Sequence, residues 1–201
     1  APLWLRDKFL SLIRRESANA KEGKKAHIIA KMNSLCDQKI IAALYEASSA
    51  GVKIELIVRG ICCLRPGISG VSDNVTVRSI VGNFLEHSRI FYFYNDGFED
   101  VYMGSADWMP RNLDKRVEIT FPVEDEKLKQ EVISILQLQL SDTLKAHILQ
   151  PNGREYAKQD LRGLEKIAAQ DEFCKQALNQ KSRLDETVVK TVFEPAVHKP
   201  E

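Results

Sequence analysis

Apolar positions in the first sixty residues switch between helical and strand spacing. Residues 3–22 carry apolar side chains three and four positions apart and predict an amphipathic helix. Residues 27–32 form a short apolar run, which predicts a strand. Residues 37–50 return to helical spacing with Asp37 at the N-cap position, and residues 52–58 are almost continuously apolar. Such a run suits a strand covered on both faces, and strand–helix–strand order predicts a parallel pair.

The middle of the chain alternates in shorter segments. Apolar and polar positions alternate over residues 75–78 and predict another strand. Residues 88–94 and 100–103 predict two strands, and Asn95-Asp96-Gly97 between them is a strong hairpin signal. Residues 117–121 alternate again and predict one more half-exposed strand.

The last third of the chain is mainly helical in pattern. Apolar residues at every fourth position predict a long helix over residues 125–141. Residues 145–158 predict a small hairpin around Pro151-Asn152-Gly153, and residues 160–181 predict a further helix. The end of the chain, which contains Pro195 and Pro200, is expected to be a loose tail.

These elements predict an α/β fold, in which a mixed β-sheet is flanked by helices and followed by a helical C-terminal part. We assign residues 1–123 to the α/β core with its N-terminal helix. Residues 124–201 are assigned to the helical C-terminal part and tail of the same domain. A chain of 201 residues is long enough for one substantial core.

Composition narrows the class of partner and compartment. The chain is 44% hydrophobic and 28% charged with a net charge of +1, so a polyanion would have to bind to a local cluster of Arg and Lys. The longest apolar runs are too short to cross a bilayer, and no secretory signal is visible. The spacing of the four cysteines fits no zinc pattern, which indicates reduced thiols in a cytosolic protein and no metal site. The start at Ala1-Pro2 without methionine suggests a fragment or a processed product.

The strongest chemical signal is His87-Ser88-Arg89, followed after the hairpin by Gly104-Ser105. Residues two apart on a strand project to the same side, so His87 and Arg89 are expected to face one ligand. An imidazole beside a guanidinium and a hydroxyl at Ser105 suits phosphorus chemistry. Asp107 is a candidate to orient His87. The alternative, a histidine satisfied by a backbone carbonyl, is the more common role of a lone histidine.

Further arginines are candidates for phosphate contacts. Arg59-Gly60 follows the second predicted strand, and ligands of α/β sheets bind beyond the carboxyl ends of parallel strands. A surface arginine that ends a strand is about as plausible there. Arg65 opens a loop rich in Pro and Gly, which could bind phosphate through its backbone, but this signal is weak because most Pro-Gly loops are simple turns. Arg111 is a possible polyanion contact, with solvated charge as the ordinary alternative. Trp108 is expected in the core.

Longer blocks of sequence carry a family resemblance. They include Lys31-Met32-Asn33-Ser34-Leu35, Leu56-Ile57-Val58-Arg59-Gly60, Phe84-Leu85-Glu86-His87-Ser88-Arg89 and Gly104-Ser105-Ala106-Asp107-Trp108-Met109-Pro110-Arg111-Asn112. These blocks closely resemble the C-terminal region of bacterial polyphosphate kinase. The resemblance is strong over residues 5–123 and loose beyond.

The resemblance implies reversible transfer of the ATP γ-phosphate to inorganic polyphosphate through a phosphohistidine, with Mg²⁺. It implies a phospholipase D-like fold for this chain, as the second of two such domains. His87 then matches a histidine that faces the nucleotide phosphates, and Arg59 matches an ATP-binding arginine. The phosphorylated histidine and the Mg²⁺ ligands are expected in a preceding domain of the same polypeptide. The implied partners are ATP or ADP and polyphosphate, without nucleic acid, in a cytoplasmic homo-oligomer whose membrane association is left open.

Three positions depart from the phospholipase D motif. Arg89 stands where that motif has lysine, Tyr94 where it has aspartate and Asp107 where it has asparagine. These departures argue against lipid hydrolysis. Two alternatives stay open: a phospholipase D-like phosphodiesterase with His87 as nucleophile, and a polyanion-binding module without catalysis. Cleavage of a phosphodiester without ATP would favour the first, and binding with steep salt dependence but no turnover would favour the second.

Overall fold

The structure, a computed structural model, describes residues 3–185 of the chain. The described residues divide into two units at the boundary between Ala169 and Gln170. The second unit contains most of helix α4 (Ala169–Asp185). The predicted loose tail lies outside the described residues, and the assignment of residues 170–201 to the same domain as the core stays a prediction.

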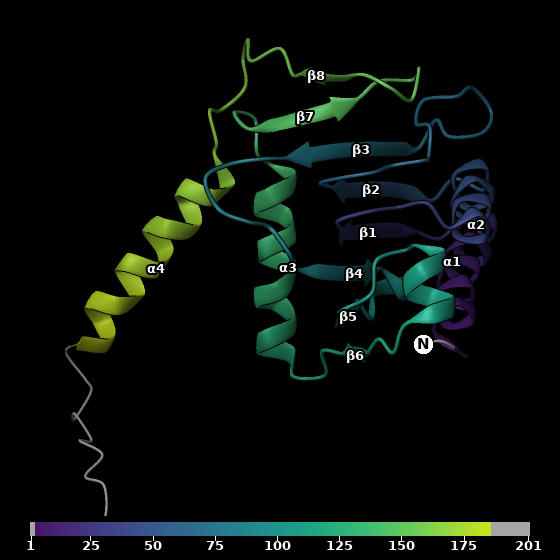
Figure 1. Cartoon of the computed structure of the whole chain (residues 1–201), viewed down its shortest axis with the longest axis horizontal. Coiled ribbons are helices and arrows are strands. Elements are labelled where there is room, and N and C mark those ends of the chain that lie inside the picture. Colours follow the sequence, from purple (N-terminus) through teal and green to yellow (C-terminus); the bar gives the residue numbers. More distant parts are fainter. Residues whose placement is uncertain (1–2, 186–201) are drawn as a thin grey trace, which may run out of the picture. The chain divides into compact units, whose positions relative to one another are not determined.

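An eight-stranded sheet forms the centre of the first unit, with the strand order β6-β5-β4-β1-β2-β3-β7-β8 (Figure 1). Strand β2 pairs in parallel with β1 and with β3. The remaining strand pairs of the sheet are antiparallel. The sheet is therefore mixed, as predicted. The strands are β1 (His27–Met32), β2 (Lys53–Val58), β3 (Val75–Ile80), β4 (Arg89–Phe93), β5 (Asp100–Gly104), β6 (Thr120–Pro122), β7 (Ala146–Leu149) and β8 (Tyr156–Lys158).

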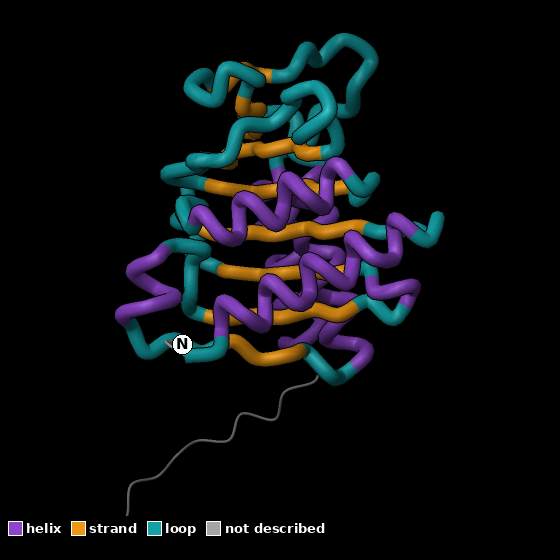
Figure 2. The backbone as a smooth tube through the Cα atoms, turned by 90° about the vertical axis from the view of Figure 1, so that its right-hand side faces the viewer, coloured by secondary structure: helices purple, strands orange, loops and turns teal. Residues whose placement is uncertain are grey.

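Helices cover both faces of the sheet. Helices α1 (Leu5–Lys21) and α2 (Gln38–Ser49) cross one face, and α3 (Glu126–Leu140) lies on the other (Figures 1 and 2). Because side chains alternate along a strand, each central strand contributes to two hydrophobic cores. In β1, Ile28 and Ala30 pack in the core of α1 and α2, whereas Ile29 packs in the core of α3. The same alternation directs the side chain of Lys31 to the α3 face.

Several local predictions are confirmed. The Asp37 side chain caps α2 by accepting a hydrogen bond from the Ile40 amide at 3.1 Å. The strands β4 and β5 are joined through Asn95-Asp96-Gly97, which form a short 3₁₀ turn, η1 (Asn95–Gly97). The hairpin around Pro151 is present as β7 and β8. Trp108 is fully buried and stacks on Phe91 with ring centroids 5.1 Å apart.

Most element boundaries differ from the predictions by one or two residues, and three differences need an explanation. Strand β6 begins at Thr120 rather than residue 117, because its partner β5 ends at Gly104, opposite Thr120. Residues 117–119 therefore lie beyond the end of the strand with which they would pair. Residues 160–168 are not helical: Gly163 has a φ of +75°, and the Asp142 carboxylate holds the Ala169 amide at 2.7 Å. Strand β4 begins at Arg89, so His87 lies outside it.

Candidate functional site

The carboxyl ends of the parallel strands meet at one edge of the sheet, and the candidate residues follow them. Asn33 follows β1, Arg59 follows β2, and the segment of residues 81–88 connects β3 to β4. Strand β5 runs antiparallel to β4 and ends at this edge with Gly104 opposite Arg89. The register therefore brings four separate stretches of the chain to one place.

His87 is exposed and is held at two points. Its Nδ1 lies 3.2 Å from the side-chain nitrogen Nδ2 of Asn33, and its carbonyl oxygen accepts a hydrogen bond from Nη1 of Arg89 at 2.9 Å. The prediction that His87 and Arg89 project from the same strand is wrong. His87 precedes the strand, and the Arg89 guanidinium turns back onto the His87 backbone.

Asp107 completes this network without touching the His87 ring. Its carboxylate pairs with the Arg89 guanidinium, with Nε–Oδ1 at 3.0 Å and Nη2–Oδ2 at 3.3 Å. It also accepts the backbone amide of Asn33 at 2.8 Å. The expected direct contact from Asp107 to His87 is therefore replaced by two indirect ones, through Asn33 and Arg89.

The Asn33 contact determines the chemistry that His87 can perform. An amide nitrogen only donates, so Nδ1 of His87 accepts and the ring proton resides on Nε2. The free face of the ring is then a hydrogen-bond donor. A donor at this position can bind a phosphate oxygen or stabilise a leaving oxygen, whereas a nucleophile would need a lone pair on Nε2.

Lys31 is a functional candidate that the sequence reasoning missed. Its Nζ lies 3.0 Å from a Glu86 carboxylate oxygen and donates to the Ser88 hydroxyl at 2.7 Å, while the side chain is only 4% exposed. Burial lowers the pKa of this ammonium, and the Glu86 carboxylate opposes that effect. The available signal was a single charged residue inside the apolar run of β1.

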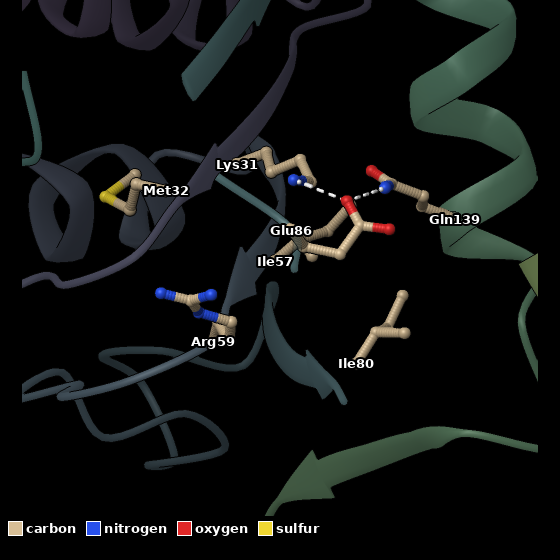
Figure 3. A pocket seen from close by; sticks show the side chains of 7 residues that line it. All are labelled: Lys31, Met32, Ile57, Arg59, Ile80, Glu86 and Gln139. Carbon is tan, nitrogen blue, oxygen red and sulfur yellow. Dashed lines mark hydrogen bonds and ion pairs between the residues drawn. The ribbon is translucent and has the colours of Figure 1, made fainter. Parts of the chain in front are cut away.

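A residue of helix α3 also binds the Glu86 carboxylate. The side-chain nitrogen of Gln139 donates to Glu86 Oε2 at 2.9 Å, so the carboxylate bridges β1 and α3 (Figure 3). These side chains line a cavity of about 10 Å³ together with Arg59, Ile57 and Ile80, which is room for about one water molecule. Gln139 Oε1 is buried and has no hydrogen-bond partner in the part of the chain that the structure describes.

Arg59 has a fixed backbone and a free guanidinium. Its amide donates to the Met32 carbonyl at 3.3 Å, and its carbonyl accepts from the Ser79 hydroxyl at 3.2 Å. Within residues 3–185 no carboxylate or other acceptor pairs with its side chain, which points away from Glu86 in Figure 3. Gly60 does allow a close approach, but of the Asn33 carbonyl, which accepts the Gly60 amide at 2.7 Å. A half-buried, unpaired guanidinium at this edge is a suitable anion contact.

The structure does not bring Arg65 to this edge. Its Nε and Nη2 donate to the Pro151 carbonyl at 3.2 and 3.0 Å. Pro151 follows β7, which runs antiparallel to β3, so this contact lies at the amino ends of the parallel strands. Arg65 thus fastens the β7–β8 turn at the opposite end from Arg59.

Ser105 and Arg111 differ in how they are engaged. The Ser105 hydroxyl binds the Glu118 carboxylate and accepts the Ile119 amide at 3.2 Å. The close approach at Gly104 is to the chain itself, because a Cβ there would lie 2.5 Å from the Ile119 carbonyl oxygen. Arg111 begins a short π-helical turn, η2 (Arg111–Lys115), and is exposed. No hydrogen bond or ion pair of its side chain is found among the described residues.

Neither a metal centre nor a membrane span is found in the described part of the chain. No group of three or more His, Cys, Asp or Glu side chains lies close enough to hold a metal ion. No helix in that range is long and apolar enough to cross a bilayer.

Comparisons with known proteins agree on one family. The family model described as "Polyphosphate kinase C-terminal domain 2" matches residues 1–170. A polyphosphate kinase of Pseudomonas putida is 60% identical over 154 residues, covering 77% of this chain and 21% of that protein. One from Synechocystis is 51% identical over 178 residues, covering 89% of this chain and 24% of that protein. This chain thus spans about a fifth to a quarter of the length of these relatives.

Solved structures agree with the sequence comparisons. The crystal structure of polyphosphate kinase from Porphyromonas gingivalis superimposes with a TM-score of 0.84 at 40% identity, covering 90% of this chain and 28% of that chain. NucT from Helicobacter pylori superimposes with a TM-score of 0.51 at 18% identity, covering 70% of this chain and 91% of that chain. The second likeness shows a shared fold alone.

Proposed function

This chain belongs to the polyphosphate kinase C-terminal domain 2 family, and from that premise we propose that it contributes Arg59 and His87 to an ATP–polyphosphate phosphotransferase site. The substrates are ATP or ADP and inorganic polyphosphate. The phosphorylated histidine and the Mg²⁺ ligands come from another part of the same polypeptide.

The observation that supports this role most directly is the contrast between Arg59 and its neighbours. Lys31 and Arg89 each have a carboxylate partner, whereas the Arg59 guanidinium has none among the described residues. A guanidinium binds two phosphate oxygens in one plane, and this contact strengthens as charge spreads over the transferring phosphoryl group. Arg59 therefore binds the nucleotide phosphates and stabilises the transition state.

His87 acts as a hydrogen-bond donor in this proposal. The bond from the γ-phosphorus to the bridging oxygen of ADP breaks as a bond to the acceptor histidine nitrogen forms, and negative charge develops on the departing ADP oxygen. The Nε2 proton of His87 binds that oxygen or a neighbouring phosphate oxygen. Because Asn33 occupies Nδ1 as a donor, the geometry does not favour a phosphodiesterase in which His87 attacks phosphorus.

The test uses the complete polypeptide that contains this chain, with synthesis of polyphosphate from ATP as the assay. His87→Ala should lower kcat by about 10²- to 10⁴-fold, as expected for loss of a positioned proton donor. Arg59→Ala should lower kcat/KM by about 10²-fold, and Arg59→Lys should recover part of the loss because an ammonium lacks the planar fork.

Arg154→Ala is the matched control, because Arg154 is exposed in the β7–β8 turn and its side chain forms no hydrogen bond or ion pair among the described residues. It should leave synthesis unchanged. Wild-type activity of both Arg59→Ala and His87→Ala would overturn the proposal. A stable phosphoryl group on His87 itself would reverse the assignment of nucleophile and helper.

A further inference from the structure

His87 lies in a segment that backbone pairing does not hold. Residues 81–88 have no regular secondary structure, and Val81, Phe84 and Leu85 expose 64%, 59% and 76% of their surface. A histidine in such a segment samples many positions unless side chains restrain it. Asn33 contacts its ring and Arg89 its carbonyl oxygen, and the residues on either side of it are held as well.

One buried ammonium contacts both neighbours of His87. Lys31 Nζ lies 3.0 Å from the Glu86 carboxylate and 2.7 Å from the Ser88 hydroxyl, so it straddles the histidine. Gln139 of α3 binds the same carboxylate at 2.9 Å from the other side (Figure 3). Resting on the proposed function, we propose that Lys31, Glu86 and Gln139 form a clamp that positions His87 for phosphoryl transfer.

The clamp also gives a role to the helix that follows the strand core. Gln139 lies near the end of α3 and is 2% exposed, so its amide has little freedom to turn away. A hydrogen bond from a buried amide to a carboxylate is stronger than one between neutral groups. Through it, α3 fixes the segment of residues 81–88 against the sheet and acts as a positioning element.

Occupation of Glu86 keeps Arg59 available. Both groups line the same small cavity, and a carboxylate without other partners would attract the nearby guanidinium. Lys31 and Gln139 hold the carboxylate, and Arg59 points away from it (Figure 3). The clamp thus positions His87, the hydrogen-bond donor, and leaves the Arg59 guanidinium free to bind phosphate.

Substitutions on both sides of the contact test the clamp in the complete polypeptide. Gln139→Glu places two carboxylates side by side and should lower kcat for polyphosphate synthesis about tenfold or more. Glu86→Gln keeps the size of the side chain but removes the charge that Lys31 and Gln139 bind at one oxygen atom, Oε2, and should lower kcat to a similar extent. KM for ATP should rise in Gln139→Glu, because the added carboxylate attracts Arg59, and should stay within about twofold in Glu86→Gln, which adds no such attraction.

Gln137→Glu is the control for the charge change, since Gln137 lies on the same helix but is exposed. It should leave kcat unchanged. Gln139→Met keeps the volume without the donor and should lower kcat about threefold to tenfold with little change in thermal stability. This second variant decides the matter if Gln139→Glu does not fold.

Either of two results would overturn the clamp: wild-type kcat in Gln139→Met, or wild-type kcat in Glu86→Gln. His87→Ala separates this failure from that of the proposed function. If His87→Ala abolishes synthesis while the clamp variants are fully active, only the clamp is wrong. If His87→Ala and Arg59→Ala are both fully active, the proposed function itself is wrong.

Discussion

Asp107→Asn removes one negative charge from the network behind His87 while keeping the side chain nearly the same size. The Asp107 and Arg89 side chains are only 8% and 11% exposed, and two N–O contacts of 3.0 and 3.3 Å join them. The variant leaves the Arg89 guanidinium buried opposite a neutral amide. It tests whether the charge of Asp107, rather than its shape, holds the network together.

The expected loss follows from the burial of the pair. Removing one partner of a buried ion pair costs roughly 3–5 kcal/mol, because the remaining charge stays desolvated. The asparagine oxygen can still accept one hydrogen bond, from Arg89 or from the Asn33 amide. We therefore expect the free energy of unfolding to fall by about 2–3 kcal/mol.

Urea unfolding of the 201-residue chain, extrapolated linearly to water, measures this loss. Asp114→Asn is the matched control, because Asp114 also pairs with an arginine, Arg6, but its side chain is 44% exposed. That change should cost much less. The double variant with Arg89→Met should lose less than the sum of its single variants, with a coupling energy of about 1 kcal/mol or more.

Equal losses in Asp107→Asn and Asp114→Asn would refute this reasoning, since burial would then not matter. Additive losses of unfolding free energy in Asp107→Asn with Arg89→Met would also refute it, because they would mean that the two charges do not stabilise each other.

Three further outcomes are expected. Asn33→Leu should remove the hydrogen bond to Nδ1 of His87 and lower kcat, because the ring then loses the contact that keeps its proton on Nε2; kinetics of the complete polypeptide would detect the loss. An unchanged kcat would show that the donor role of His87 does not depend on Asn33. Arg65→Ala should leave KM for ATP unchanged but lower the stability of the chain by about 1 kcal/mol, because two hydrogen bonds to the β7–β8 turn are lost; a raised KM would place the residue at the phosphates. Burial raises the pKa of Glu55, but hydrogen bonds from His27, at 2.8 Å, and from Lys53 lower it more strongly. The net effect is a pKa of about 2 in place of the ordinary 4.5. Since the folded-state pKa lies below the unfolded one, this stabilisation is complete above pH 4.5 and is lost as the pH falls toward 2. Between pH 6 and roughly pH 3, the free energy of unfolding should therefore fall by about 2 kcal/mol less in Glu55→Gln than in the wild type.

The sequence predicted the parts of the fold that depend on local pattern. The period of apolar residues and the cap at Asp37 were sufficient for the β1–α2–β2 unit, and that unit positions Arg59 at the correct edge. The position of His87 relative to β4 was not predictable in this way. Strand ends depend on what the neighbouring strand offers, and residue 87 lies beyond the last paired residue, Arg89.

The partners of the charged residues could not be predicted because they are far apart in the chain. Arg89 and Asp107 are separated by 18 positions and meet only through the register of β4 with β5. Lys31 and Ser88 are separated by 57 positions and meet because β1 pairs with β4. Sequence reasoning left Arg89 in need of an anion, and the anion is a carboxylate of the chain itself.

This pairing changes what the charged edge can recognise. From the sequence, four arginines were candidates for a polyanion-binding surface, but Arg89 is bound to Asp107, and Arg65 lies at the opposite end of the sheet. Lys31 is neutralised by Glu86. Among the described residues, Arg59 and Arg111 have no counter-charge, and of the two only Arg59 is half-buried. A half-buried guanidinium without a counter-charge beside an oriented donor, His87, fits a phosphate group held at the edge of the sheet.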